Sequence, residues 1–457
     1  MIKAMILAAG QGTRMKSQIP KVMHKICGES LMEWVARAAS DAGSDETIVI
    51  VGHGKNEICS AYEQKGWHFA DQPIEDGAPY GTGYAAMQGM KFIDDEDEVF
   101  ILTGDTPLIE GADLTALLQK HRNSKAVATV LSAKMEDPTG YGRILHDTKG
   151  VVGIVEQKDA TAEERLIQEI NSGIFCFQGK ALKIALAGLT TENAQGEYYL
   201  TDSLQILREL GQQVESYCMK DADHIRGINS RVQLAEATKI RQQWINTHWM
   251  EEGVTLIDPA STYIDVDVSI GQDTLIEANV QLKGKTVIGS NVEIGSMSKI
   301  VDSVIGDAVT IDSSKILEST VGRKTTIGPY AYLRPKSQIG EGCRIGDFVE
   351  VKNAVIGNGS KASHLSYVGD AIVGERVNIG CGVVFVNYDG KKKSQSIVED
   401  DAFIGSNANL VAPVHVKKKG FVAAGSTITR DVEEGDLSIA RAKQVNKAGW
   451  AERFFNK

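Results

Sequence analysis

The sequence predicts an α/β protein with two successive folds: a mostly parallel sheet covered by helices and then, after a connecting helix, a parallel β-helix. Two patterns along the chain lead to this prediction. Up to about residue 228 short apolar runs alternate with helical stretches, and from Ile270 an aliphatic residue returns every six positions. Alternating strands and helices are typical of a parallel sheet with covering helices, whereas a period of six is typical of β-helix coils.

The first fold is expected over residues 1–229. Its strands are predicted at five β-branched or apolar runs: KAMIL, ETIVIVG, EVFILTG, AVATVLSA and GIFCF. Helical stretches such as SLMEWVARAASDAG stand between them and would cover the sheet. Residues 230–250 then contain helix formers without Gly or Pro, and we expect a linker helix there, with apolar residues at near-helical spacing: Val232, Ala235, Ile240 and Trp244.

The β-helix is expected over residues 251–457. Its aliphatic residues follow the six-residue spacing in three runs: Ile270, Ile276, Leu282, Ile288, Ile294 and Ile300; Val321, Ile327, Leu333, Ile339, Ile345 and Val351; Val398, Ile404, Leu410, Val416, Val422 and Ile428. Three repeats close one coil, and stacked coils bury the aliphatic column. Between Ile379 and Val398 the spacing is 19, one more than three repeats, so FVNYDGKKKSQ is predicted to leave the coil as a loop. The basic tail from Asp436 loses the repeat and is expected to pack over the last coils.

The composition excludes several classes of partner and location. Lys and Arg total 49 against 60 Asp and Glu, so the formal net charge is −11 and argues against nucleic acid or an anionic membrane as a general partner. Because no stretch of 18 apolar residues occurs, no membrane span is expected. The six cysteines stand far apart without metal-ligand spacing, which predicts reduced thiols and a cytoplasmic protein.

A phosphate-binding turn is predicted after the first strand. Gly10 and Gly12 stand where that strand ends, and glycines there let backbone N–H groups approach phosphates, while Arg14 and Lys21 can neutralise the charge. The Rossmann dinucleotide fingerprint fails because Met15 replaces its third Gly, and no complete P-loop motif occurs. A G-x-G pair alone also fits a tight turn that only closes the strand.

Asp105 is a candidate ligand for Mg²⁺. It follows the apolar strand VFILTG, and ligands of an open parallel sheet bind beyond the carboxyl ends of its strands. Mg²⁺ prefers a few carboxylate or amide oxygens together with substrate phosphates. The alternative is that Asp105 caps the helix predicted at PLIEGADLTALL.

His364 is a candidate general base in the β-helix. It lies in SKASHLSYVGD, where an unpaired imidazole buried against an aliphatic coil would be costly, so it requires a partner or a chemical role. An imidazole that titrates near neutrality suits the removal of a proton from an amine. Taken alone, a single His in such a place is more often structural than catalytic.

Seven segments together resemble a known family: LAAGQGTRM followed by PK, GTG (81–83), GD (104–105), PTGYGRI (138–144), VEQKDAT (155–161), EINSGI (169–174) and GEYYLTD (196–202). They look like the sugar-1-phosphate uridylyltransferases. With its hexapeptide half, nearly the whole chain resembles the bacterial bifunctional N-acetylglucosamine-1-phosphate uridylyltransferases/glucosamine-1-phosphate N-acetyltransferases. The resemblance implies a Rossmann-like nucleotidyltransferase domain, a left-handed parallel β-helix acetyltransferase domain, and synthesis of UDP-N-acetylglucosamine for cell-wall polymers from acetyl-CoA and UTP with Mg²⁺.

For the first domain, the resemblance implies a uridylyl-transfer site. The nucleotide would lie on Leu7, Ala8, Ala9 and Gly10, with Lys21 and Arg14 at its phosphates and Gly81, Thr82 and Gln72 on its uracil side. Asp105 and Asn229 would hold Mg²⁺, and the amino sugar phosphate would bind Gly140, Glu156, Asn171 and Asn229. Thr103 stands where the family usually has an aromatic residue, and the segment before Gly81 is longer than usual.

For the second domain, the resemblance implies that His364 is the catalytic base of an acetyl transfer. Arg334 and Lys352 would clamp the sugar phosphate, and Tyr367 and Asn378 would hold the sugar. The acetyl-CoA groove would include Cys381, Asn387, Tyr388, Ser406, Ala424 and Arg441. Cys381 stands where relatives commonly have Ala, and direct attack by the amine needs no acyl-enzyme on it. The lysines at 391–393 and the basic tail are further candidates for the coenzyme A phosphates.

The resemblance also implies a homotrimer with ligand sites between β-helices. Two other functions remain open on the sequence alone. One is a single-activity sugar-1-phosphate nucleotidyltransferase with a regulatory β-helix, against which His364, Asn387 and Tyr388 argue. The other is a non-catalytic assembly subunit, against which Lys21, Asp105 and Asn229 argue.

Overall fold

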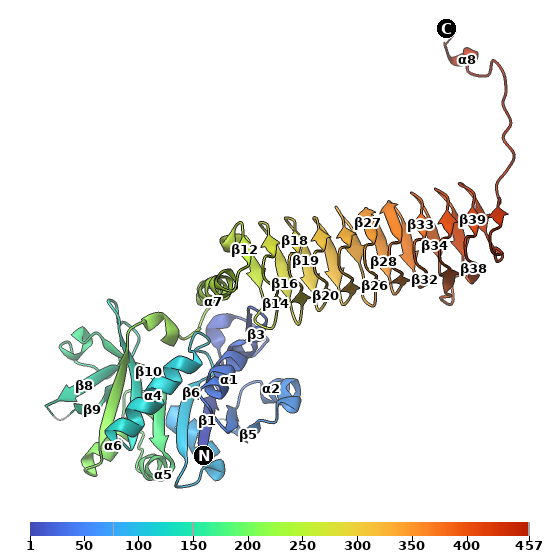
Figure 1. The fold of residues 1–457 in the computed structure, drawn as a ribbon. Coiled ribbons are helices and arrows are strands. Elements are labelled where there is room, and N and C mark those ends of the chain that lie inside the picture. Colours follow the sequence, from blue (N-terminus) through green and yellow to red (C-terminus); the bar gives the residue numbers. More distant parts are fainter. Residues whose placement is uncertain (76, 149, 456–457) are drawn as a thin grey trace. The chain divides into compact units, whose positions relative to one another are not determined.

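A computed structural model describes residues 1–75, 77–148 and 150–455 of the chain. It divides into two compact units, Met1–Arg241 and Gln242–Lys457. The first is an α/β unit and the second a β-helix, so the predicted fold class is confirmed (Figure 1).

The sheet of the first unit is mostly parallel, as predicted. Along its main path the strands follow the order β11 (Val214–Met219), β7 (Ala128–Lys134), β10 (Glu169–Gln178), β6 (Glu98–Thr103), β1 (Ile2–Leu7), β4 (Glu46–Val51) and β5 (His68–Asp71). Only β10 among these runs antiparallel to its neighbours. The hairpin of β8 (Arg143–Asp147) and β9 (Gly150–Val155) joins the sheet through β10.

Helices cover both faces of this sheet and form two apolar cores. Buried residues of α1 (Leu31–Asp41), α2 (Lys55–Tyr62) and α4 (Gly111–Ser124) belong to one core. Those of α3 (Thr82–Gly89), α5 (Gly179–Ala187) and α6 (Asp202–Glu209) belong to the other. Helix α1 begins where a capping box forms, because the Ser30 side chain accepts from the Glu33 N–H and the Glu33 carboxylate accepts from the Ser30 N–H.

The long helix α7 (Arg231–Glu251) occupies the segment where a linker helix was expected. Its first half belongs to the α/β unit, where Arg241 donates to Glu110 Oε1 at 3.0 Å. Its second half belongs to the β-helix unit, where Ile245 and Trp249 pack against the aliphatic core. There the Asn246 side chain also donates to the Thr262 carbonyl at 2.9 Å.

The β-helix consists of three parallel sheets, one for each face (Figure 1). The first contains β12 (Thr255–Leu256), β15 (Leu275–Ile276), β18 (Glu293–Ile294), β21 (Thr310–Ile311), β24 (Thr326–Ile327), β27 (Arg344–Asp347), β30 (Lys361–His364), β33 (Asn378–Ile379), β36 (Phe403–Ile404), β39 (Phe421–Val422) and β41 (Leu437–Ser438). The second contains β13 (Tyr263–Ile264), β16 (Gln281–Lys283), β19 (Lys299–Val301), β22 (Lys315–Leu317), β25 (Tyr332–Leu333), β28 (Glu350–Lys352), β31 (Tyr367–Gly369), β34 (Val384–Val386), β37 (Asn409–Val411) and β40 (Thr427–Ile428). The third contains β14 (Ser269–Ile270), β17 (Val287–Ile288), β20 (Val304–Ile305), β23 (Thr320–Val321), β26 (Gln338–Ile339), β29 (Val355–Ile356), β32 (Ala371–Val373), β35 (Ser396–Val398) and β38 (Val414–Val416).

The predicted aliphatic column is the core of this unit, and every residue of the three sequence runs is buried in it. Between Ile300 and Val321 the repeat is not lost but shortened. Buried isoleucines occur at 305, 311 and 316, so three of the four steps across this stretch are five residues long. A turn with one residue fewer still lets the next side chain point inward, because neighbouring coils pair through backbone hydrogen bonds.

The loop predicted between Ile379 and Val398 is present and closed on itself. Residues 387–395 leave the coil between β34 and β35, and an antiparallel bridge joins Tyr388 to Lys393. The Asp389 carboxylate accepts from the backbone N–H groups of Lys391 and Lys392, each at 2.8 Å.

The prediction for the tail is wrong. Residues 439–455 are all exposed and do not cover the last coils; Figure 1 shows them leaving the β-helix and ending in the short helix α8 (Glu452–Phe455). The last attachments are hydrogen bonds of Ala440 to Ser426 and Thr427. Within the described residues, no helix is long and apolar enough to cross a membrane.

Candidate active sites

A cleft of about 270 Å³ lies in the α/β unit, at the end of the sheet where β1 and β6 finish. Nine of the ten residues expected at the nucleotide line this one cleft: Leu7, Ala8, Ala9, Gly10, Lys21, Gln72, Gly81, Thr82 and Asp105. The cleft is also lined by Val22, Tyr80, Ala85, Thr103 and Glu197. Parallel strands bring these distant segments together because their carboxyl ends share one edge. The tenth residue, Arg14, is exposed and does not line the cleft.

The far wall of the cleft depends on a close backbone contact at Gly81. Its φ is +117°, and a Cβ there would lie 2.4 Å from the Tyr198 carbonyl oxygen. Only glycine fits, and the contact is closed by hydrogen bonds from Gly83 N–H to Tyr198 and from Leu200 N–H to the Thr82 hydroxyl. The segment that resembles the family at 196–202 thereby shapes the pocket.

Lys21 contacts both residues that the resemblance assigns to Mg²⁺. Its ammonium donates to Asp105 Oδ2 at 2.5 Å and to Asn229 Oδ1 at 3.1 Å. Two oxygens of different chain segments therefore already converge on a positive charge. One carboxylate and one amide oxygen fit Mg²⁺, which takes its remaining ligands from water and substrate phosphates. No group of three His, Cys, Asp or Glu that could hold a metal occurs among the described residues.

Asp105 does not cap the helix that follows it. Helix α4 begins at Gly111, and its N-cap is Glu110, which forms a capping box with Asp113. The competing structural explanation for Asp105 is therefore wrong, and its carboxylate faces the cleft.

Sequence reasoning assigned no role to Glu197, which also lines the cleft. Burial raises the pKa of its carboxyl group, and the charge of Lys158 only partly opposes that shift. Its presence in the GEYYLTD segment was the available signal, because that segment was one of those that carried the resemblance.

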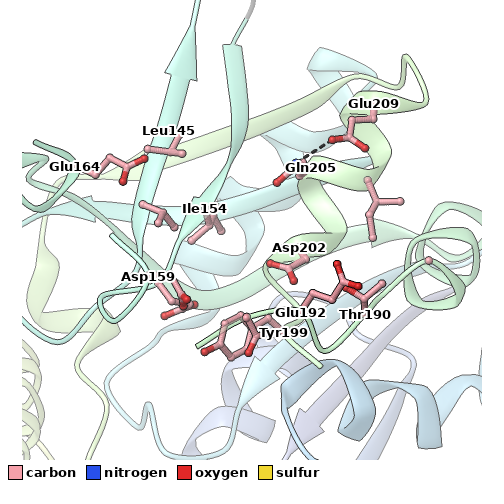
Figure 2. Close-up of a pocket in the computed structure, with 15 residues that line it drawn as sticks. Leu145, Ile154, Asp159, Glu164, Thr190, Glu192, Tyr199, Asp202, Gln205 and Glu209 are labelled. Atoms are coloured by element: carbon pink, nitrogen blue, oxygen red, sulfur yellow. Dashed lines mark hydrogen bonds between the residues drawn. The ribbon is translucent and has the colours of Figure 1, made fainter. Parts of the chain in front are cut away.

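The residues expected at the amino sugar do not all face this cleft. Glu156 lines a separate cavity of about 530 Å³. Five further carboxylates line the same cavity and are labelled in Figure 2: Asp159, Glu164, Glu192, Asp202 and Glu209. Burial raises the pKa of Glu156, and the negative charges of Asp202 and Asp159 add to the shift. No Lys or Arg among the described residues lines this cavity.

Gly140 and Asn171 are held close to the hairpin β8–β9 by hydrogen bonds to residues that flank its two strands. The Gly140 N–H donates to Gln157 Oε1 at 3.2 Å, and Gln157 is in turn held by the buried Arg143 at 2.8 Å. Asn171 pairs with Gly142 through its N–H and accepts from the Gly173 N–H through its side chain. Neither residue lines the nucleotide cleft or the acidic cavity.

His364 in the second unit is not buried, contrary to the expectation. It ends strand β30, and 54 % of its side chain is exposed. Its Nδ1 lies 2.7 Å from Asp347 Oδ1 on the preceding coil. The imidazole therefore projects from the coil with a partner, and a buried structural role is excluded.

Polar side chains predicted at the sugar phosphate lie along the second sheet, whose strand β31 follows β30 directly in the chain. Arg334 Nη1 lies 2.8 Å from Glu350 Oε1, and Lys352 Nζ lies 3.8 Å from Asp370 Oδ2. Asp370 also accepts from the side chains of Asn353 and Asn387. Burial acts to raise the pKa of Asp370, but these hydrogen bonds and the nearby lysines outweigh it and hold that pKa low.

Two more predicted residues connect to this set. The Asn387 amide donates to the Tyr367 hydroxyl at 3.4 Å, and Asn387 is itself buried. Lys393, one of the lysines predicted at the coenzyme A phosphates, has Lys352 as a neighbour, and the Lys352 side chain lowers the pKa of Lys393 through hydrogen bonding and through its positive charge. Two cations, Lys352 and Lys393, therefore lie close together, and Lys352 is one of the residues predicted at the sugar phosphate.

The remaining predicted acetyl-CoA residues follow one corner of the β-helix. Cys381, Ser406 and Ala424 each lie two residues after the end of a successive strand, β33, β36 and β39, and all three are exposed. Backbone hydrogen bonds join this corner from coil to coil: Gly382 to Leu365, Asn407 to Cys381, and Gly425 to Ser406. Tyr388 is exposed on the adjacent loop, and Arg441 is exposed at the start of the tail. Asn378 begins β33, one coil beyond His364.

Comparison with family models agrees with the two folds. The MobA-like NTP transferase domain matches residues 4–169. The bacterial transferase hexapeptide model (six repeats) matches residues 267–301, and the GMPPB C-terminal domain matches residues 315–437.

Curated relatives match along the full length. The chain is 53 % identical to the bifunctional protein GlmU of Clostridioides difficile over 452 residues, which covers 99 % of this chain and 97 % of that protein. It is 48 % identical to the proteins of the same name from Alkaliphilus metalliredigens and Listeria monocytogenes, again over at least 98 % of each chain. The chain therefore belongs to the family of bifunctional GlmU proteins.

Proposed function

We propose that this chain makes UDP-N-acetylglucosamine in two steps. The β-helix unit acetylates glucosamine-1-phosphate with acetyl-CoA, and the α/β unit then transfers UMP from UTP to N-acetylglucosamine-1-phosphate and releases pyrophosphate. The observation that carries the proposal is that one chain holds both sets of residues: nine of those predicted at the nucleotide surround one cleft, and an outward-facing His364 is paired with Asp347.

The uridylyl transfer needs no protein nucleophile. An oxygen of the sugar phosphate attacks the α-phosphorus of UTP in line, the new P–O bond forms, and the bond to pyrophosphate breaks. The chain's task is to position both substrates and to stabilise the charge that develops on pyrophosphate. Ala9 and Gly10 have no large side chain, so the phosphates can approach their backbone N–H groups. Lys21 lines the same cleft and supplies a positive charge.

Asp105 and Asn229 are the residues that would hold Mg²⁺. When bound, the metal supplies positive charge at the phosphates and helps to orient them. Lys21 then loses both of its present partners, and its ammonium becomes available to the phosphates within the same cleft.

The acetyl transfer needs a base. The sugar ammonium loses a proton to His364 so that its nitrogen can attack the thioester carbonyl. As the C–N bond forms and the C–S bond breaks, a second proton leaves the nitrogen and coenzyme A departs as the thiol. Arg334, Lys352 and Lys393 clamp the sugar phosphate, and the backbone N–H groups or Ser406 along the corner stabilise the oxyanion.

The active form is a homotrimer in which β-helices pack side by side. Apolar and aromatic side chains exposed close to His364 support this: Tyr330 stacks on Phe348 with ring centroids 5.6 Å apart, and Leu365 lies on the next coil. Exposed large apolar groups that gather at one corner are typical of protein contacts. All six cysteines lie among the described residues and are reduced, which supports the cytoplasmic location expected from the sequence.

The two competing functions account for less of the molecule. A purely regulatory β-helix does not require an exposed His–Asp pair. A non-catalytic assembly subunit does not require a cleft lined by the residues predicted at the nucleotide. The test is a pair of separate assays on the purified chain: acetyl-CoA with glucosamine-1-phosphate, and UTP with N-acetylglucosamine-1-phosphate. Activity in both supports the proposal, activity in the second alone supports the regulatory β-helix, and activity in neither supports the assembly subunit.

A further inference from the structure

The partner of His364 is a carboxylate that the sequence reasoning did not single out. Asp347 lies 17 positions earlier, one coil before His364 on the same face, and its Oδ1 is 2.7 Å from the imidazole Nδ1. The hydrogen bond from His364 holds the pKa of Asp347 below its ordinary value, so its carboxyl group is ionised near neutral pH. An ionised carboxylate can only accept, and the proton of this hydrogen bond must therefore be on Nδ1.

The β-helix is locally modified where these two residues meet. Among the eleven strands of the first sheet, only β27 and β30 are four residues long, and the other nine have two. The extension brings Asp347 and His364 into direct register as the last pair of the ladder. Elsewhere on this face the chain turns the corner two residues sooner.

Gly346 makes the extension possible. A Cβ at that position would lie 1.9 Å from the Ser363 carbonyl oxygen, far inside contact distance, so any side chain would force the two strands apart. The Leu365 N–H closes the far end of the pair by donating to the Asp347 carbonyl at 2.8 Å. Backbone contacts on both sides of the pair therefore fix its geometry.

From this geometry we propose that Asp347 is the positioning residue for the base His364. By accepting the Nδ1 proton it selects the tautomer whose Nε2 carries a free lone pair, and it keeps that nitrogen turned away from the coil. It also stabilises the imidazolium that forms when Nε2 takes the proton of the sugar ammonium. Asp347 itself does not touch the substrate. The inference rests on the proposed acetyl transfer.

The first test is kinetic. Asp347→Ala should lower the kcat of acetylation about 10-fold. This loss is smaller than the factor of about 10² to 10⁴ that is expected when the base itself is removed. The KM values for both substrates should stay within about threefold, since phosphate and coenzyme A bind elsewhere. Asp347→Asn, whose amide oxygen can still accept from Nδ1, should lie between wild type and the Ala variant.

A matched control is available in the same β-helix. His415 Nε2 lies 2.8 Å from Glu399 Oε1, a half-buried His–carboxylate pair on the third sheet, which contains none of the predicted acetyl-transfer residues. Glu399→Ala should leave acetylation unchanged. Uridylyl transfer and the melting temperature, measured on every variant, show whether each one is folded.

The second test reads the tautomer directly. With ¹⁵N-labelled histidine, the neutral His364 of the full-length protein should carry its proton on Nδ1, and Asp347→Ala should shift it toward Nε2. A kcat within twofold of wild type in Asp347→Ala, or an unchanged tautomer, overturns the inference. If His364→Ala also retains full acetylation, the proposed function fails with it; if His364→Ala is inactive, only the role of Asp347 is overturned.

Discussion

At the scale of one residue, Glu156 shows how a residue predicted to bind substrate can lower the free energy of unfolding. Its pKa is raised, chiefly by burial and further by Asp202 and Asp159, so the folded chain holds that proton more tightly than the unfolded chain does. Stability from this group is therefore complete below its ordinary pKa and is lost as pH rises through the raised value. At neutral pH the ionised carboxylate destabilises the fold.

We therefore expect Glu156→Gln to melt at a higher temperature than wild type at pH 7, by a few degrees, while the KM for N-acetylglucosamine-1-phosphate rises. The difference in melting temperature should disappear toward pH 4. Glu164 lines the same cavity and is the control, because hydrogen bonds from Thr161 lower its pKa and Glu164→Gln should not stabilise. A lower melting temperature for Glu156→Gln at pH 7 would contradict this interpretation.

Lys21 leads to a prediction about metal affinity. Its ammonium donates to both proposed Mg²⁺ ligands, so in the absence of nucleotide it competes with the metal for Asp105 and Asn229. A hydrogen bond between charged groups contributes about 1.5–3 kcal/mol, so Lys21→Met should bind Mn²⁺ about tenfold more tightly when titrated without nucleotide.

The same variant should be slow in uridylyl transfer, because the charge beside the phosphates is gone. Lys25→Met, a change at an exposed lysine on the short strand β2 (Lys25–Ile26), is the control and should alter neither property. If Lys21→Met binds Mn²⁺ no better than wild type does, the metal does not use these oxygens.

Most residues predicted for the nucleotide do lie together in the structure, and the features that sequence reasoning missed have structural reasons. Nine nucleotide residues converge because the ends of parallel strands must share one edge. Asp347 could not be paired with His364, because the distance between them depends on one coil having 17 residues instead of 18. The nearness of Lys393 to Lys352 could not be predicted, because it depends on how the loop closes through the bridge between Tyr388 and Lys393.

At the scale of the strand, Gly346 allows β27 and β30 to pair closely. A Cβ there would meet the backbone of β30, which no side-chain movement can relieve. Gly346→Ala should separate Asp347 from His364, lower acetylation about 10-fold or more, and lower the melting temperature of the β-helix. Gly342, with open space around its Cβ position but positive φ, should cost stability without loss of acetylation when changed to Ala. Equal acetylation by both variants would contradict the importance of the strand extension.

Whole elements were predictable where one rule governs them. The six-residue period located most coils, because each coil must return an aliphatic residue to the same column. The six-residue spacing did not identify the shortened coils after Ile300. Packing requires that each aliphatic side chain point into the core, and it does not require a fixed number of residues per turn. The tail could not be placed, because no periodicity or apolar face determines where an exposed segment lies.

At the scale of the whole molecule, each unit has its own core. Two apolar clusters belong to the α/β unit, and a third fills the β-helix. A fragment of residues 1–250 should therefore melt cooperatively and retain uridylyl transfer without acetylation. The side chains of Gln242 and Asn246 would lose their carbonyl partners in the β-helix but would gain water, so little stability is lost. A folded fragment without uridylyl transfer would show that the division of labour is wrong.

The central claim is that one chain has two independent active sites that act in sequence. Full-length Asp105→Ala and His364→Ala, alone and mixed, are given glucosamine-1-phosphate, acetyl-CoA, UTP and Mg²⁺, and the products are followed by mass. Asp105→Ala should accumulate N-acetylglucosamine-1-phosphate, and His364→Ala should form product about 10² to 10⁴ times more slowly unless it receives that intermediate. The mixture should restore UDP-N-acetylglucosamine, because the intermediate diffuses from one site to the other. If either variant loses both reactions, or if the mixture remains inactive, the two sites are not independent and the account is contradicted.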